Sequence, residues 1–147
     1  MKRHKTFATE RLLLKPISLE DAELVFELLN SPKWVKYIGD RNIKSIKDAK
    51  KYIRTKMLPQ LIRIGFSVYT LVIKQNNIKI GTCGLYDREG IDGIDIGFAL
   101  LPEYEKKGYA FDSSKKLMNV AFNEFGVKEI SAITTEENIS SNKLLHR

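Results

Sequence analysis

One stretch, residues 94–112 (IDIGFALLPEYEKKGYAFD), constrains the fold of this chain more than any other. In its first half, small or polar side chains alternate with apolar ones, and the apolar ones are Ile94, Ile96, Phe98 and Leu100. This two-residue period is typical of a β-strand. Pro102 predicts the end of the strand, because proline has no N–H group to give to a neighbouring strand.

A helical period follows the strand directly. Side chains that would share one helix face recur every three or four positions: Ala110, Ser114, Leu117, Ala121 and Phe125, with Met118 and Phe122 widening the stripe. Gly126 stands where a glycine commonly follows the end of a helix. The sequence therefore predicts a strand, a short basic turn and a helix that begins near Ala110.

The turn has the chemistry of an anion site. The amides of Lys107, Gly108, Tyr109 and Ala110 fall at the start of the helix, where they have no partner within it. Gly108 lets a ligand approach the backbone closely, and Lys106 and Lys107 add positive charge. The alternative is a strand, turn and helix that bind nothing, with both lysines as ordinary surface residues.

Size and composition favour one soluble globular domain over residues 1–147. Hydrophobic residues make up 43% of the chain, and the formal net charge is +7. The basic residues form no run of five or more, so this charge does not favour a nucleic-acid partner over a phosphate-rich cofactor. The single cysteine, Cys83, predicts a buried core residue in a reducing, cytoplasmic setting. We expect no metal site, signal peptide or membrane span.

Before this stretch we expect a strand over residues 10–17 and then two helices. Ser18 would cap the first helix, which buries Ala22, Val25, Phe26 and Leu29 and ends at residues 30–32. Ser45 would cap the second, which ends before Pro59. Its inward residues would be Ile46, Ala49, Ile53 and Met57.

A hairpin is predicted next, with strands over residues 66–74 and 78–86. Gly81 and Gly84 within it indicate a bulge or a close approach of two backbones. After the helix that follows residue 108, we expect a strand over 128–134 and a final helix capped by Asn138. The final helix has no stop signal, so we expect the domain to continue beyond residue 147.

Five short motifs in this order resemble the GCN5-related N-acetyltransferase (GNAT) superfamily, and most of all the branch that acetylates ribosomal-protein N-termini. The resemblance covers nearly the whole chain. The motifs are Thr9–Leu14, Ile80-Gly81, Asp95–Phe98, Glu105–Ala110 and Asn138–Asn142. The chain has Glu105 where the family usually has Gln or Arg, and Phe111-Asp112-Ser113 where the branch usually has Thr-Glu-Ala.

The resemblance implies a GNAT fold of the α+β class, with a mixed, mostly antiparallel sheet flanked by helices and its last strands outside these 147 residues. It also implies acetyl-CoA as cosubstrate and direct transfer of the acetyl group to a primary amine, on a protein N-terminus or a small molecule. The pantetheine arm would pair with the backbone of Phe98, Ala99 and Leu100. The pyrophosphate would bind the amides of Lys106, Lys107, Gly108, Tyr109 and Ala110.

Two residues are candidates for the chemistry. Asp95 could take a proton from the attacking amine, since amines are mostly charged at neutral pH. It would share a strand face with Gly97 and Ala99, which leave room for a substrate; the alternative is a solvated strand carboxylate. By resemblance, Ser141 would donate a hydrogen bond to the leaving thiolate, and the alternative is a polar residue in the first turn of a helix.

Other residues have two interpretations each. Asn138 could bind the pantetheine amide, cap the last helix, or do both. Trp34 and Tyr37 could line the acceptor site, although packing into the core is favoured for both. Tyr109 is expected to pack beneath the loop.

Two rival functions stay open at this point. A non-catalytic module could bind CoA or another phosphate ligand as a sensor on the same fold. A nucleic-acid-binding protein would bind in a strongly salt-dependent manner. The sequence leaves the acceptor and the oligomeric state open.

Overall fold

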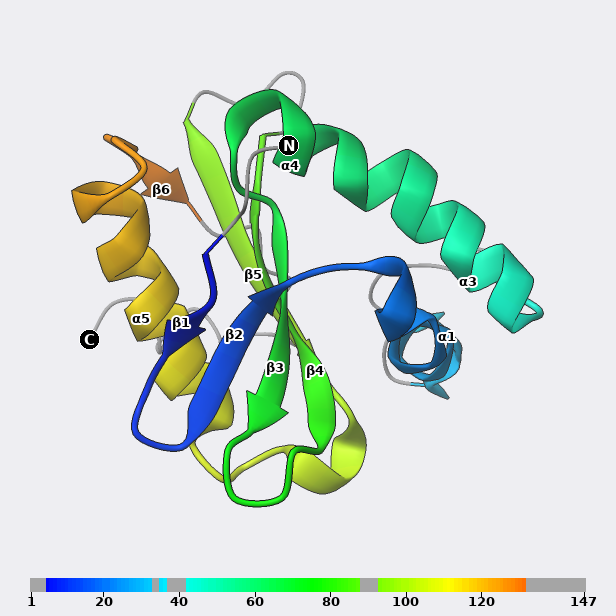
Figure 1. Ribbon diagram of the computed structural model, residues 1–147. Helices are drawn as coiled ribbons and strands as arrows, with labels where there is room; N and C mark the ends of the chain where they lie inside the picture. Colours follow the sequence, from blue (N-terminus) through cyan, green and yellow to red (C-terminus); the bar gives the residue numbers. More distant parts are fainter. Residues whose placement is uncertain (1–4, 33–34, 37–41, 88–92, 132–147) are drawn as a thin grey trace.

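The computed structural model describes residues 5–32, 35–36, 42–87 and 93–131. In this part of the chain, six strands form one sheet in sequence order (Figure 1). The strands are β1 (Phe7–Ala8), β2 (Leu12–Pro16), β3 (Val68–Ile73), β4 (Lys79–Tyr86), β5 (Ile94–Leu100) and β6 (Ile130–Ser131). Neighbours from β1 to β5 are antiparallel, and β5 and β6 are parallel. This sheet confirms the predicted α+β class with a mixed, mostly antiparallel sheet.

Helices cover both faces of the sheet, as Figure 1 shows. Helix α5 (Tyr109–Asn123) packs on one face, over a core cluster that includes Leu14, Leu71 and Ile96. The opposite face carries η1 (Leu19–Asp21), α1 (Ala22–Asn30), α3 (Ile46–Tyr52), the π-helix η2 (Ile53–Met57) and α4 (Leu58–Ile64). A second core cluster lies there and includes Val25, Ala49, Ile53 and Val68. The strands contribute side chains to both clusters, because successive side chains of a strand point to opposite faces of the sheet.

The turn into the first helix is fixed to the sheet by Asp21. Ser18 is the N-cap, as predicted, and its N–H donates to the Asp21 carboxylate at 3.0 Å. The same carboxylate accepts from the Thr70 hydroxyl at 2.9 Å and pairs with the Lys79 ammonium at 2.6 Å. Because Asp21 is 5% exposed, these partners compensate a charge that would otherwise be costly to bury. Helix α1 then ends at Asn30, within the predicted range.

The expected end of the second helix at Pro59 was wrong. The chain stays helical from α3 through η2 and α4 to Ile64, because Pro59 lies in the first turn of α4, where its missing N–H costs nothing. The wider turn of η2 separates the two α-helical segments. Ile46 was expected to point inward, but it is 37% exposed.

The predicted hairpin is confirmed as β3 and β4. The pairing shifts register between Leu71 and Val72, opposite Ile80, so Ile80 and Cys83 both reach the core beneath α5. Gly81 lies at a close approach of β4 to β5. A Cβ atom there would lie 2.2 Å from the Ala99 carbonyl oxygen. Both predicted features, a bulge and a close approach of two backbones, are therefore present.

Two other expectations need correction. The N-terminal segment contains a short strand, β1, that the sequence pattern did not indicate. Phe122 was expected in the buried stripe of α5 but is 44% exposed, because it lies at the outer edge of that stripe. The helix itself ends near the predicted position, and Gly126 adopts φ +70° just beyond it.

The close contact at Gly81 gives a stability prediction. We expect Gly81→Ala to lower the free energy of unfolding by about 2 kcal/mol, because the added methyl group must push backbone atoms of β5 apart. Gly97→Ala in β5 is the matched control, since its Cβ would meet Tyr86 Cε2 at an ordinary 3.6 Å. Urea titration of both variants measures the difference, and equal losses would show that the close approach has no energetic effect.

Burial makes Cys83 an unreactive thiol. The side chain is 0% exposed beneath α5, with its sulfur 3.9 Å from the Ser114 hydroxyl. Burial raises the pKa of the Cys83 thiol from 9.0 to about 11, while hydrogen bonds from Ser114 and Ser113 lower that pKa by less. This agrees with the expectation of a small core residue.

Stability should therefore fall as the pH rises from 9 to 11, because the unfolded thiol ionises in this window and the folded one does not. We expect the wild type to lose up to roughly 2–3 kcal/mol of unfolding free energy relative to Cys83→Ala between these limits. Urea unfolding under reducing conditions at both pH values measures this. A constant difference between the two proteins would contradict the raised pKa.

Candidate functional site

The loop between β5 and α5 has an unusual backbone. It begins with a single turn, η3 (Pro102–Tyr104), whose Pro102 carbonyl accepts from the Glu105 N–H at 3.2 Å. Lys106 and Gly108 then both adopt positive φ, +62° and +84°. For a lysine this conformation costs about 1 kcal/mol, and such strained residues concentrate at ligand sites. The loop therefore holds a shape that its sequence alone does not favour.

The amides at the end of this loop and the start of α5 have no described acceptor. Gly108 is the N-cap of α5 and has no side chain to satisfy the first turn. The first backbone bond of the helix runs from the Asp112 N–H to the Gly108 carbonyl at 3.0 Å. Among the described residues, no hydrogen bond uses the N–H groups of residues 107–111. With the positive end of the helix dipole, these groups have the chemistry that an anion site requires.

One edge of β5 faces away from its antiparallel neighbour. The Leu101 N–H, just after β5, donates to the carbonyl of Ile80 in β4. These two residues therefore occupy a hydrogen-bonded position of the ladder between the two strands. Such pairs alternate along an antiparallel ladder, so the backbone groups of Ile96 and Phe98 point to the other edge. Within the described residues, β6 pairs there only with Ile94 and Asp95. No described residue pairs with the backbone of Phe98 on that edge, whereas the backbone of Ala99 faces β4.

Asp95 lies where β5 and β6 meet. It is 3% exposed, so the alternative of a solvated carboxylate does not hold. Its side chain belongs to the sheet face opposite α5, the face that Gly97 and Ala99 share. Tyr86, opposite Asp95 in the register, lies over Gly84, where an added Cβ would be 2.6 Å from its hydroxyl oxygen. Small residues and one tyrosine ring therefore form the floor beside Asp95.

Sequence reasoning missed the part that Arg11 has in this site. Its Nη1 donates to the Lys107 carbonyl at 2.9 Å, and Nε and Nη2 donate to Asp112 Oδ2 at 3.0 and 2.6 Å. The guanidinium also lies over the Tyr109 ring, 4.4 Å from its centroid. The first motif of the resemblance contained Arg11, but no local pattern relates that motif to residues about a hundred positions away.

The remaining predicted residues fall into two groups. Lys106 and Lys107 are exposed beside the loop amides, and Tyr109 and Ala110 pack partly against the core, as expected of Tyr109. Four candidates lie outside the described residues: Trp34, Tyr37, Asn138 and Ser141. The structure thus describes the loop before α5 and Asp95, and their roles, like those of the acceptor aromatics and the leaving-group serine, stay predictions.

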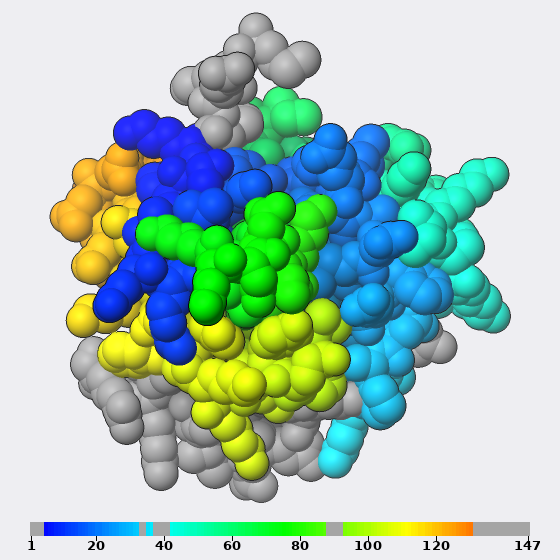
Figure 2. All heavy atoms as spheres, turned by 60° about the horizontal axis from the view of Figure 1, so that its bottom comes forward, coloured from blue at the N-terminus to red at the C-terminus, as the bar shows by residue number. Residues whose placement is uncertain are grey.

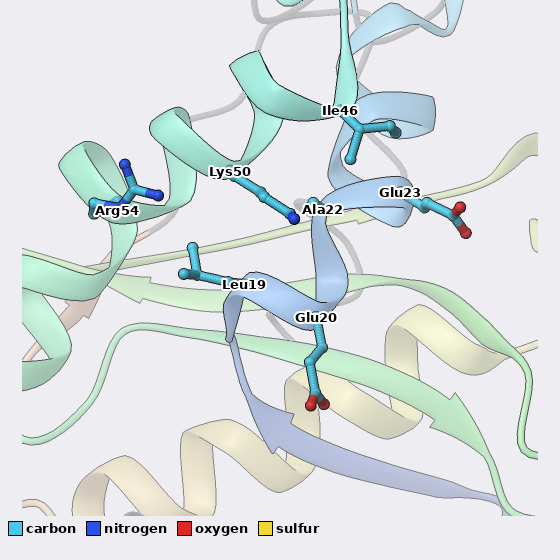
Figure 3. A pocket seen from close by; sticks show the side chains of 7 residues that line it. All are labelled: Leu19, Glu20, Ala22, Glu23, Ile46, Lys50 and Arg54. Carbon is cyan, nitrogen blue, oxygen red and sulfur yellow. The ribbon is translucent and has the colours of Figure 1, made fainter.

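A separate hollow of ≈ 500 Å³ lies between the start of α1 and the helix α3–η2. Figure 3 shows Lys50 extending toward Ala22, while Glu20 and Glu23 point away from it. The hollow is lined by Leu19, Glu20, Ala22, Glu23, Ile46, Lys50 and Arg54. None of these residues belongs to β5 or to the loop before α5, so the hollow is distinct from the site above.

Two features of other protein classes are absent from the described part of the chain. No helix there is long and apolar enough to cross a bilayer. The same residues contain no group of three or more His, Cys, Asp or Glu side chains that could hold a metal ion.

Comparison with known proteins assigns the class. The sequence model of the family described as Acetyltransferase (GNAT) domain matches residues 11–147. An uncharacterized N-acetyltransferase of Bacillus licheniformis, p20, is 30% identical over 145 residues, which is 97% of this chain and 80% of that protein. The chain therefore belongs to the GNAT family of acetyltransferases, which use acetyl-CoA as acetyl donor.

Solved structures share the fold. An acetyltransferase from Agrobacterium tumefaciens matches with a TM-score of 0.83 and 19% identity, over 100% of this chain and 84% of that one. RimL, a ribosomal L7/L12 alpha-N-protein acetyltransferase in complex with coenzyme A, matches with a TM-score of 0.75 and 17% identity, over 97% and 82%. The ribosomal-protein branch is thus among the structural neighbours.

Two glycines at opposite ends of α5 allow a test of the loop. We expect Gly108→Ala to weaken CoA binding at least about tenfold, because a side chain disfavours φ +84° and would lie 3.0 Å from Arg11 Nη2. Gly126→Ala carries the same kind of backbone penalty at φ +70° with nothing within 4 Å, so it should lose stability but keep its affinity. Calorimetric titration with CoA measures both, and equal affinities would contradict the loop as the binding site.

Proposed function

We propose that this protein transfers the acetyl group of acetyl-CoA to a primary amine, on a protein N-terminus or on a small molecule. The observation that carries the proposal is the run of loop amides without an acceptor among the described residues. It follows in the chain after the buried carboxylate of Asp95 and the edge of β5 at Phe98, with which no described residue pairs. Together these features fit the three parts of the donor: its diphosphate, its extended arm and its reactive end.

The residues that would hold the donor follow from this geometry. The N–H groups of residues 107–111, with Lys106 and Lys107 beside them, would bind the diphosphate. Backbone groups of Phe98 would pair with the pantetheine arm as a neighbouring strand would. Asp95 lies three residues back along β5, about 10 Å at the usual rise of a strand. The donor supplies the acetyl group as an activated thioester.

Asp95 is the residue we assign to proton transfer. In the transfer, the amine nitrogen bonds to the acetyl carbon, the carbon–sulfur bond breaks, and the amine loses a proton. A carboxylate in a buried position accepts this proton directly or through one water molecule. On this face of the sheet the Tyr86 ring lies over Gly84 and beside Gly97, and Ala99 packs against two leucines of α1, so the acceptor would approach Asp95 along these side chains. Tyr86, over this floor, would contact the acceptor beside Asp95.

The acceptor's chemical class rests on the family and on this floor. The structural likeness to RimL supports a protein N-terminus as one candidate, and a small-molecule amine is the other. Both present the same reacting group, a primary amine that must lose a proton before or during attack. Trp34, Tyr37, Asn138 and Ser141 stay proposed as contacts of acceptor and donor on the basis of the resemblance.

Acetyl transfer to a panel of N-terminal peptides and small amines tests the proposal through release of free CoA. We expect turnover by the wild type, and a fall in kcat of about 100-fold or more in Asp95→Asn with CoA affinity unchanged. Asp48→Asn is the control, because it changes a carboxylate on α3, distant in the fold from β5.

The outcomes separate the alternatives. Tight CoA binding without turnover on any amine would favour a sensor on the same fold. Turnover in which Asp95→Asn matches the wild type would remove Asp95 from the proton transfer and keep the acetyltransferase. No binding of CoA would contradict the proposed function itself.

A further inference from the structure

We propose that Arg11 is a positioning residue that holds the loop before α5 in its ligand-binding shape, so that it controls donor affinity without touching the donor. The proposal rests on the function proposed above, since it concerns the same loop. Arg11 is contributed by the opposite end of the chain, in the turn between β1 and β2. Figure 2 shows this blue N-terminal segment lying against the yellow segment that leads into α5.

The contact to the Lys107 carbonyl sets the direction of the neighbouring amide. A trans peptide plane points its C=O and its N–H to opposite sides. Because Arg11 Nη1 donates to the Lys107 carbonyl at 2.9 Å, the Gly108 N–H of the same peptide must point away from Arg11. That direction is the side of the loop on which an anion would bind. Arg11 therefore decides whether this peptide presents a donor or an acceptor to the ligand.

The ion pair between Arg11 and Asp112 compensates a negative charge close to the loop amides. Asp112 lies in the first turn of α5, so its carboxylate is near the amides that would bind a diphosphate. Two N–H groups of Arg11 converge on Asp112 Oδ2, and the pair is only partly exposed, 41% and 29% for the two side chains. The pair compensates a negative charge that would otherwise repel the ligand.

The remaining contacts fix Arg11 in place. Its guanidinium lies 4.4 Å from the centroid of the Tyr109 ring, and that ring packs against the core beneath α5. A Cβ atom on residue 108 would lie 3.0 Å from Arg11 Nη2, so the loop also needs glycine at this position. One guanidinium thus contacts or crowds Lys107, Gly108, Tyr109 and Asp112. Lysine could not replace it, because an ammonium has neither the planar fork nor the stacking face.

Steady-state kinetics with acetyl-CoA test this role. We expect Arg11→Ala to raise KM for acetyl-CoA about tenfold or more, because it loses charge-assisted hydrogen bonds and exposes the ligand to Asp112, while kcat changes less than about threefold. In Arg11→Ala/Asp112→Asn, part of the affinity should return, since the uncompensated carboxylate is gone. Arg63→Ala is the matched control, an arginine in an exposed pair with Asp87 at 3.0 Å.

Hydrogen exchange in the ligand-free protein gives an independent readout. We expect faster exchange of the two hydrogen-bonded amides of this segment, those of Glu105 and Asp112, in Arg11→Ala than in the wild type or Arg63→Ala, with core amides of β3 and β4 unchanged. If the wild type is active and Arg11→Ala has the same KM or the same loop exchange as the wild type, the role of Arg11 alone is overturned. A wild type that neither binds CoA nor turns over would overturn the proposed function, and the exchange result would still report on the loop.

Discussion

Backbone amides in the first turn of a helix must find acceptors outside that helix: water, a side-chain cap or a ligand. In this protein Gly108 occupies the N-cap of α5 and offers no side chain, and the described residues provide no other acceptor. Positive φ at Lys106 and Gly108 holds the amides in this arrangement, and at Lys106 this backbone conformation has a cost in conformational energy. A bound diphosphate would recover that cost, which links the backbone of one loop to the chemistry of the family.

The sheet fixes the position of β5, the strand that leads into this loop. Strand β5 is held by β4 along its whole length, and the tight crossing at Gly81 leaves little freedom in that register. Along the other edge, β6 is paired only at Ile94 and Asp95 within the described residues. Asp95 is therefore buried where two strands meet, and the backbone of Phe98 faces the edge that no described residue pairs with. A mostly antiparallel sheet with one parallel neighbour produces this asymmetry.

Charge in the site is arranged by pairing rather than by accumulation. The net charge of +7 is spread over the chain and does not by itself identify a partner. Near the loop, Arg11 offsets Asp112 and orients the Lys107 carbonyl, so the positive potential comes from ordered amides and two exposed lysines. The same principle holds at the start of α1, where Lys79 and Thr70 compensate the buried Asp21.

Local periods in the sequence determined the strand at 94–100, the hairpin before it, and the turn and helix after it, because hydrogen bonding and side-chain alternation act over a few residues. They failed at Pro59, which is compatible with both the end and the first turn of a helix. Only the tertiary structure decided that Arg11 reaches Asp112, 101 positions away, and that Asp95 is buried. Contacts of this kind depend on how distant segments pack, and no local pattern encodes that packing.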